Sequence, residues 1–125
     1  MDIRFTDREL DIIEVLWERG PSTVAEVRDA LDDDLAYNTV LTMLKVLEEK
    51  GHVEREREGR AHRYRPTVER GAASRSALDR VTDRLFGGSA SAVLLELVDG
   101  GGLDDTELRR MRDLLDSRLR EEDER

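Results

Sequence analysis

The sequence predicts a mostly α-helical protein in which three helices and a β-hairpin are followed by three more helices. Apolar residues recur at helical spacing in six stretches, each with a capping residue or a glycine on at least one side. Two short runs, residues 53–58 and 61–65, flank a glycine-containing centre, which is typical of a hairpin. We therefore expect one domain over residues 1–66 and a helical domain over residues 67–125.

The composition excludes several classes of protein. The 125 residues contain no cysteine, so disulfides, thiolate metal sites and a cysteine nucleophile are ruled out. No run approaches the roughly 18 apolar residues of a membrane span, and no signal-like segment is present. We expect a cytoplasmic chain without membrane insertion.

Catalytic and metal signals are also weak. No nucleophile–base pair and no phosphate-cradling glycine loop stands out, so we expect no enzymatic activity and no cofactor. His52 and His62 are the only histidines. Without cysteine they are a poor basis for a zinc site. We expect surface or phosphate-facing roles for them and no bound metal.

The first two helices have matching start signals. Thr6 with Glu9, and Thr23 with Glu26, each form a capping box. The apolar stripe of the first helix is expected to consist of Leu10, Ile13 and Trp17, with Ile12 and Leu16 beside it. Gly20-Pro21 ends that helix, the second runs to about residue 31, and the acidic residues 32–34 form a solvated linker.

The third helix, residues 37–50, has two different faces. At roughly 100° per residue, Val40, Leu44 and Leu47 share an apolar face, and Glu49 lies opposite. The candidates for contacts in a DNA groove are the polar residues of that opposite face, Asn38, Thr39, Thr42 and Lys45. Amides, hydroxyls and ammonium groups hydrogen-bond base edges and phosphates. For Asn38 and Thr39, helix capping is the alternative role.

The hairpin follows directly, after a glycine stop at Gly51. Its return run holds Arg60, Arg63 and Arg65 and no acid, so these three are candidates for phosphate binding. The alternative is a solvated edge strand whose charges block aggregation. Arg55 and Arg57 alternate with glutamates, and we expect local neutralisation there. A polar-faced helix followed by a cationic hairpin is the anatomy of a winged helix-turn-helix, which binds double-stranded DNA.

The net charge of −9 seems to oppose DNA binding, but the charge is unevenly distributed. Between residues 35 and 65, seven basic and five acidic residues give +2, so the rest of the chain carries −11. A local basic patch can therefore act on an acidic protein. The acidic total keeps one alternative open, a winged-helix protein-interaction module without DNA binding.

The second half contains three more helices, near residues 69–86, 89–98 and after Asp104. Short apolar helices joined by glycine-rich turns need a partner to cover them, and a second copy is the simplest one. The alternative is packing onto the first domain. Residues 121–125 are expected to fray. The expected dimerisation residues are Val81, Leu85, Leu94, Leu97, Leu108, Met111, Leu115 and Leu119.

Several blocks resemble the BlaI/MecI/CopY group, the penicillinase-repressor family. They are TDREL (6–10), VLW (15–17), GPSTVAEV (20–27), AYNTVLTML (36–44), LEEKG (47–51), GRAHRYRP (59–66) and LFGGS (85–89). They cover essentially the whole chain in family order. The resemblance implies a winged-helix domain, a helical dimerisation domain, and repression through binding of a palindromic operator as a homodimer.

The resemblance also bears on how such a repressor is released. In the best-known members a membrane-bound metalloprotease sensor acts upstream, and cleavage falls in the short helix, here residues 93–98. Glu96-Leu97 stands where the resemblance leads us to expect an Asn-Phe pair. The copper-responsive branch has a cysteine-rich tail, which this chain lacks. The upstream sensor or protease therefore stays unassigned.

Overall fold

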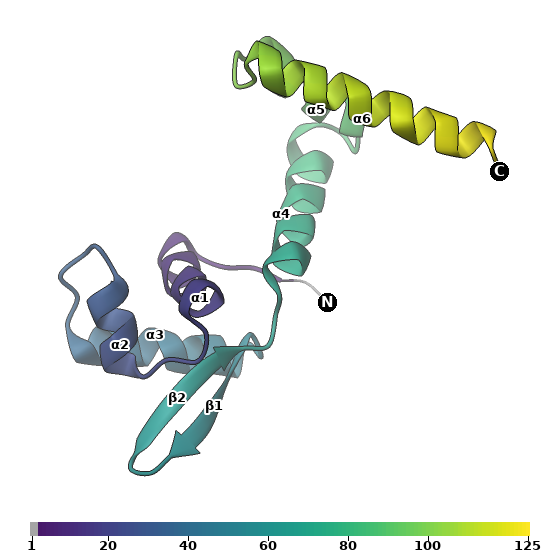
Figure 1. Ribbon diagram of the computed structural model, residues 1–125. Helices are drawn as coiled ribbons and strands as arrows, with labels where there is room; N and C mark the ends of the chain where they lie inside the picture. Colours follow the sequence, from purple (N-terminus) through teal and green to yellow (C-terminus); the bar gives the residue numbers. More distant parts are fainter. Residues whose placement is uncertain (1–2) are drawn as a thin grey trace. The chain divides into compact units, whose positions relative to one another are not determined.

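The computed structural model describes residues 3–125 and has the expected order of elements (Figure 1). They are α1 (Asp7–Arg19), α2 (Val24–Ala30), α3 (Tyr37–Glu49), β1 (Val53–Glu58), β2 (Ala61–Pro66), α4 (Arg70–Leu85), α5 (Ala90–Asp99) and α6 (Asp105–Asp123). The mostly α-helical class with a single hairpin is confirmed. Within the described residues no helix is long and apolar enough to cross a membrane.

Two compact units divide the chain between residues 78 and 79, inside α4. The first therefore includes the start of α4 as well as the three helices and the hairpin. The second contains the rest of α4, α5 and α6. The division expected after residue 66 remains a prediction about which part folds independently.

The main core of the first unit is formed by the apolar faces of α1, α2 and α3. Val40, Leu44 and Leu47 are fully buried, which confirms the inner face predicted for α3. In α1 the stripe is rotated from the expected one: Ile12 and Ile13 are buried, whereas Leu10 is exposed. The core residues that these meet on α1, α2 and the hairpin are Val15, Leu16, Val24, Val27, Val53 and Tyr64.

Local capping holds the ends of the first two helices. Thr6 and Glu9 form the predicted capping box of α1, and Thr23 and Glu26 form that of α2. Each side-chain cap contributes about 1 kcal/mol. At α3 the N-cap is Ala36, which makes no side-chain hydrogen bond. Capping is therefore not the role of Asn38 or Thr39.

The wing, β1 and β2 with their turn, is fastened to the helices at its base. Its strands pair antiparallel from Val53↔Pro66 to Glu58↔Ala61. Gly59 has φ 62° at the first position of the two-residue turn, where such hairpins favour glycine. Ser22 extends this sheet by one residue, since its N–H donates to the Tyr64 carbonyl (3.0 Å) and its carbonyl accepts from the Tyr64 N–H (2.8 Å).

A smaller cluster joins the first turns of α4 to the first unit. Ile3, Val68 and Ala73 are buried together, and Trp17 packs against them. The indole N–H of Trp17 donates to the carbonyl of Val68 at 2.8 Å, and Arg70 lies over the ring. Trp17 is thus a packing residue at the edge of the core, as predicted, with its polar atom satisfied.

The second unit is unusual in how little it buries. No side chain of α5 or α6 is buried, and the structure describes every residue of both helices. The side chains of Ser89 and Asp104 cap α5 and α6. One expectation is wrong: α6 continues to Asp123, so residues 121–123 are helical rather than frayed.

Candidate nucleic-acid interface

The exposed face of α3 carries the four predicted groove contacts. Asn38, Thr39, Thr42 and Lys45 are all solvent-exposed. The Thr42 hydroxyl donates to the carbonyl of Asn38 at 2.8 Å, and the residue remains exposed. Within the described residues Lys45 makes no ion pair, so its ammonium is free for an anion.

A groove of about 460 Å³ separates α3 from the wing. We call it the α3–wing groove, and its lining residues are Thr23, Val24, Ala25, Tyr37, Leu41, Lys45, Arg55, Arg60, Ala61, His62 and Tyr64. None of them is acidic, although the chain has 30 acidic residues. Lys45, Arg55 and Arg60 give it positive charge. An acid-free groove beside an exposed polar helix suits a phosphate backbone.

The predicted wing arginines fall into two groups. Arg60 lines the α3–wing groove and makes no ion pair within residues 3–125. Arg65 pairs with Glu54 and, at 2.8 Å, with Glu56. Only one of the three candidates is therefore free among the residues that the structure describes.

Arg63 is held on three sides. It pairs with Glu58 and, at 2.8 Å, with Glu26 of α2. It also donates to the carbonyl of Pro21 at 3.4 Å. Sequence reasoning placed neutralisation at Arg55 and Arg57 instead. The cross-strand register would have indicated otherwise, because a two-residue turn places Arg63 and Arg65 opposite glutamates of β1.

His52 does not face the surface as expected. It is 4% exposed and packs edge-on against Phe5, with ring centroids 5.1 Å apart. Burial lowers the pKa of His52, the charge of Lys50 lowers it further, and Glu9 opposes them. His62 is exposed and lines the α3–wing groove. In the part of the chain that the structure describes, no group of three metal-ligating side chains is found.

An ion pair between exposed Lys50 and the buried carboxylate of Glu9 lies at the end of α3. The Nζ of Lys50 lies 2.8 Å from Oε1 of Glu9, which is 4% exposed. Burial by itself would raise the pKa of Glu9, but hydrogen bonds from Lys50 and Thr6 hold that pKa below its usual value. The pair ties the C-terminal end of α3 to the start of α1.

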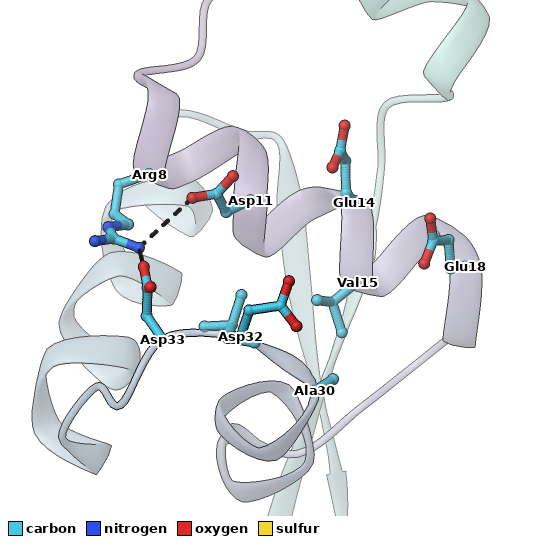
Figure 2. A pocket seen from close by; sticks show the side chains of 9 residues that line it. Arg8, Asp11, Glu14, Val15, Glu18, Ala30, Asp32 and Asp33 are labelled. Carbon is cyan, nitrogen blue, oxygen red and sulfur yellow. Dashed lines mark hydrogen bonds and ion pairs between the residues drawn. The ribbon is translucent and has the colours of Figure 1, made fainter.

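A second pocket, of about 340 Å³, has the opposite charge (Figure 2). It lies between α1 and the turn after α2, where Asp33 pairs with Arg8, and Asp11 lies 3.6 Å from the same guanidinium. Glu14 and Glu18 line its α1 side. This acidic surface would repel DNA, and it shares no lining residue with the α3–wing groove.

The fold defines a class, the winged-helix proteins. A MarR family protein from Bacillus stearothermophilus shares this fold, with a TM-score of 0.53, 22% identity, and coverage of 98% of this chain and 78% of that one. The predicted winged helix-turn-helix is confirmed.

The family follows from two further comparisons. The penicillinase repressor model matches residues 5–117. The transcriptional regulator BlaI of Mycobacterium tuberculosis is 36% identical over 111 residues, which are 86% of this chain and 80% of that protein. The chain belongs to the penicillinase-repressor family, a family of regulators rather than of enzymes.

The solved structure of a relative that carries the BlaI name also matches this chain. It is Bacillus licheniformis BlaI, whose structure in monomeric form was solved in complex with the blaP half-operator. It has a TM-score of 0.50 and 27% identity, and the match covers 58% of this chain and 90% of that chain.

Proposed function

We propose that the protein is a transcriptional repressor that binds a palindromic DNA operator as a homodimer in the cytoplasm. The observation that carries this proposal is the acid-free α3–wing groove beside the exposed polar face of α3. Family membership and the BlaI–half-operator complex support it. The same architecture provides base contacts from a helix and phosphate contacts from a wing.

Direct readout of base edges is assigned to α3. Asn38 suits adenine, the methyl group of Thr42 suits the thymine methyl, and Lys45 suits guanine or a phosphate. Thr39 lies beside them on the exposed surface. Arg60 reaches a phosphate from the turn of the wing, where it is unpaired in the described structure.

Dimerisation is assigned to the second unit. Six of the eight predicted residues are exposed in the single chain, led by Leu85 at 76% and Leu119 at 64%, and Leu108 and Met111 are partly buried. The other exposed ones are Val81, Leu94, Leu97 and Leu115. Large apolar side chains in this number favour a covering partner, and a symmetric second copy places two α3 helices on two half-sites.

The α5 helix differs from the sequence that the resemblance associates with release by cleavage. Glu96 and Leu97 are both exposed on α5, but they replace the Asn-Phe pair that the resemblance associates with cleavage.

Fluorescence anisotropy tests the proposal. The protein is titrated against its own upstream promoter DNA and a scrambled duplex of equal length, at several ionic strengths. We expect tighter binding to the promoter and weakening with added salt, because phosphate contacts release counterions. Absence of binding to either duplex at low salt would contradict the proposal and favour a protein-interaction module.

A further inference from the structure

The wing is a hairpin with two chemically different faces. Side chains alternate along a strand, and residues directly opposite each other on paired strands share a face. The pairs Arg55↔Tyr64 and Arg57↔His62 therefore lie on one face. We call it the basic face. The pairs Glu54↔Arg65 and Glu56↔Arg63 lie on the other, together with Glu58. We call that the paired face.

The paired face is neutralised within the protein. Arg65 contacts Glu54 and Glu56, while Arg63 contacts Glu58 of the wing and Glu26 of α2. Four carboxylates surround two guanidinium groups, so this cluster has a net charge of −2. A DNA phosphate approaching it would meet excess negative charge.

At the paired face, little binding free energy is gained when an arginine exchanges its carboxylate for a DNA phosphate. If Arg63 or Arg65 left its carboxylate for a phosphate, that carboxylate would have to take up a cation from solution. The uptake would offset the counterion released from the DNA, which is the main source of phosphate-binding affinity. Arg63 would also give up its link to α2. These two arginines are therefore suited to positioning the wing.

On the basic face, no carboxylate of the hairpin neutralises the arginines in the described ion pairs. Its only acidic neighbour among the described ion pairs is Glu48 of α3, whose Oε2 lies 3.7 Å from Nε of Arg55. Both side chains are about one-third exposed or more, so this pair is weak and screened. Arg57 donates to the carbonyl of Gly59 at 3.1 Å and remains exposed.

The basic face also borders the α3–wing groove, the surface proposed to bind DNA. Arg55 and His62 line the α3–wing groove together with Lys45 and Arg60. Arg57 lies opposite His62, so it continues the same face towards the turn. The basic face and α3 thus border one groove.

We propose that Arg55 and Arg57 bind DNA phosphates, and that Arg63 and Arg65 position the wing. The inference rests on the proposed function and assigns residues to its phosphate contacts. It reverses the roles expected from the sequence, in which the acid-free return strand was assigned to DNA.

Two double variants with the same change in charge test this inference. Arg55→Gln/Arg57→Gln and Arg63→Gln/Arg65→Gln each remove two positive charges from one hairpin. Binding to the preferred duplex is measured over ionic strength, and circular dichroism melts check folding. We expect the first variant to flatten the slope of log K against log salt by about 1.8, at about 0.9 per phosphate. The second should leave the slope unchanged.

Three further measurements make the outcome decisive. Arg55→Lys/Arg57→Lys keeps both charges and should restore the slope. If loss of Arg63 unfolds the wing, the single variants Arg55→Gln and Arg65→Gln replace the double ones, with an expected change of about 0.9 for the first alone. A duplex can also carry neutral methylphosphonates in place of the phosphates under the wing. The wild type should bind it with the same slope of log K against log salt that Arg55→Gln/Arg57→Gln shows on normal DNA.

The contrary results are distinct. Equal flattening by both double variants, or flattening by the second alone, would overturn the assignment while leaving DNA binding intact. A wild-type protein that binds no duplex at low salt would overturn the proposed function, and the assignment with it.

Discussion

Lys45 and Lys50 are the only lysines in the chain, and their surroundings differ. Lys45 is exposed on the polar face of α3, whereas Lys50 pairs with buried Glu9. Loss of Lys50 leaves a buried carboxylate without its cation, and one oxygen of that carboxylate already lacks a partner among the described residues. The same substitution should therefore affect stability at Lys50 and DNA binding at Lys45.

We expect Lys50→Ala to lower the free energy of unfolding by about 1–3 kcal/mol, a value reduced because Lys50 is partly exposed. Lys45→Ala should change it by less than about 0.5 kcal/mol but weaken DNA binding. Urea denaturation and anisotropy measure the two effects. Equal stability of the two variants would contradict the role given to the Lys50–Glu9 pair.

His52 makes the stability of the protein depend on pH. Its pKa is lowered in the folded state because burial disfavours the charged ring. The unfolded chain therefore binds the proton more tightly, so stability is complete above the usual histidine pKa and falls as pH drops through the folded-state value. Lys50 acts in the same direction, and Glu9 acts against it.

We expect His52→Gln to remove the loss of stability between about pH 7 and pH 5. Chemical denaturation at several pH values measures it. His62→Gln is the control, because His62 is exposed on the wing. If wild type and His52→Gln show the same pH profile in this range, the ring is not held neutral by burial.

At the scale of elements, α3 was the most predictable part of the fold. Its apolar face, its polar face and its end at Gly51 all follow from spacing within one segment. The capping boxes of α1 and α2 were predictable for the same reason, since each lies within four residues. Local chemistry was sufficient wherever the partners are close in sequence.

Features that depend on distant partners were missed. The rotation of the α1 stripe away from Leu10 follows from packing against α3, and the burial of His52 follows from contact with Phe5. The pairing of Arg63 with Glu26 joins residues 37 positions apart. Only the pairing within the wing could have been found from the sequence, by counting outward from its turn.

The two faces of α3 predict different costs for similar truncations. Leu44→Ala should destabilise the protein by about 2–5 kcal/mol, because Leu44 is fully buried and its loss leaves a cavity. Val46→Ala on the exposed side should cost less than about 0.5 kcal/mol. Thermal or urea unfolding compares them. A larger cost at Val46 would mean that α3 is rotated from the orientation described.

At the scale of the whole molecule, the second unit is the part that a single chain explains least well. Neither α5 nor α6 buries a side chain in the described structure, and the leucines of α4, α5 and α6 that are more than half exposed are Leu85, Leu95, Leu97, Leu115 and Leu119. The proposed dimer would cover these side chains.

We expect Leu115→Asp to convert the dimer into a monomer, because it places a charge in the apolar face of α6. Sedimentation velocity measures the change. Arg112→Asp is the control on the same helix, where the side chain is exposed and pairs only with its neighbour Asp113 among the described residues. A Leu115→Asp protein that still sediments as a dimer would remove α6 from the interface.

Selection from a library of random DNA duplexes tests the central claim most directly, since every possible operator sequence competes for the protein at once. The protein is incubated with the library at low salt, and bound duplexes are sequenced over successive rounds. We predict enrichment of two inverted half-sites whose centres are about 10 base pairs apart or a multiple of that distance. Failure to enrich any sequence, or enrichment of a single half-site without an inverted repeat, would contradict a dimeric operator-binding repressor.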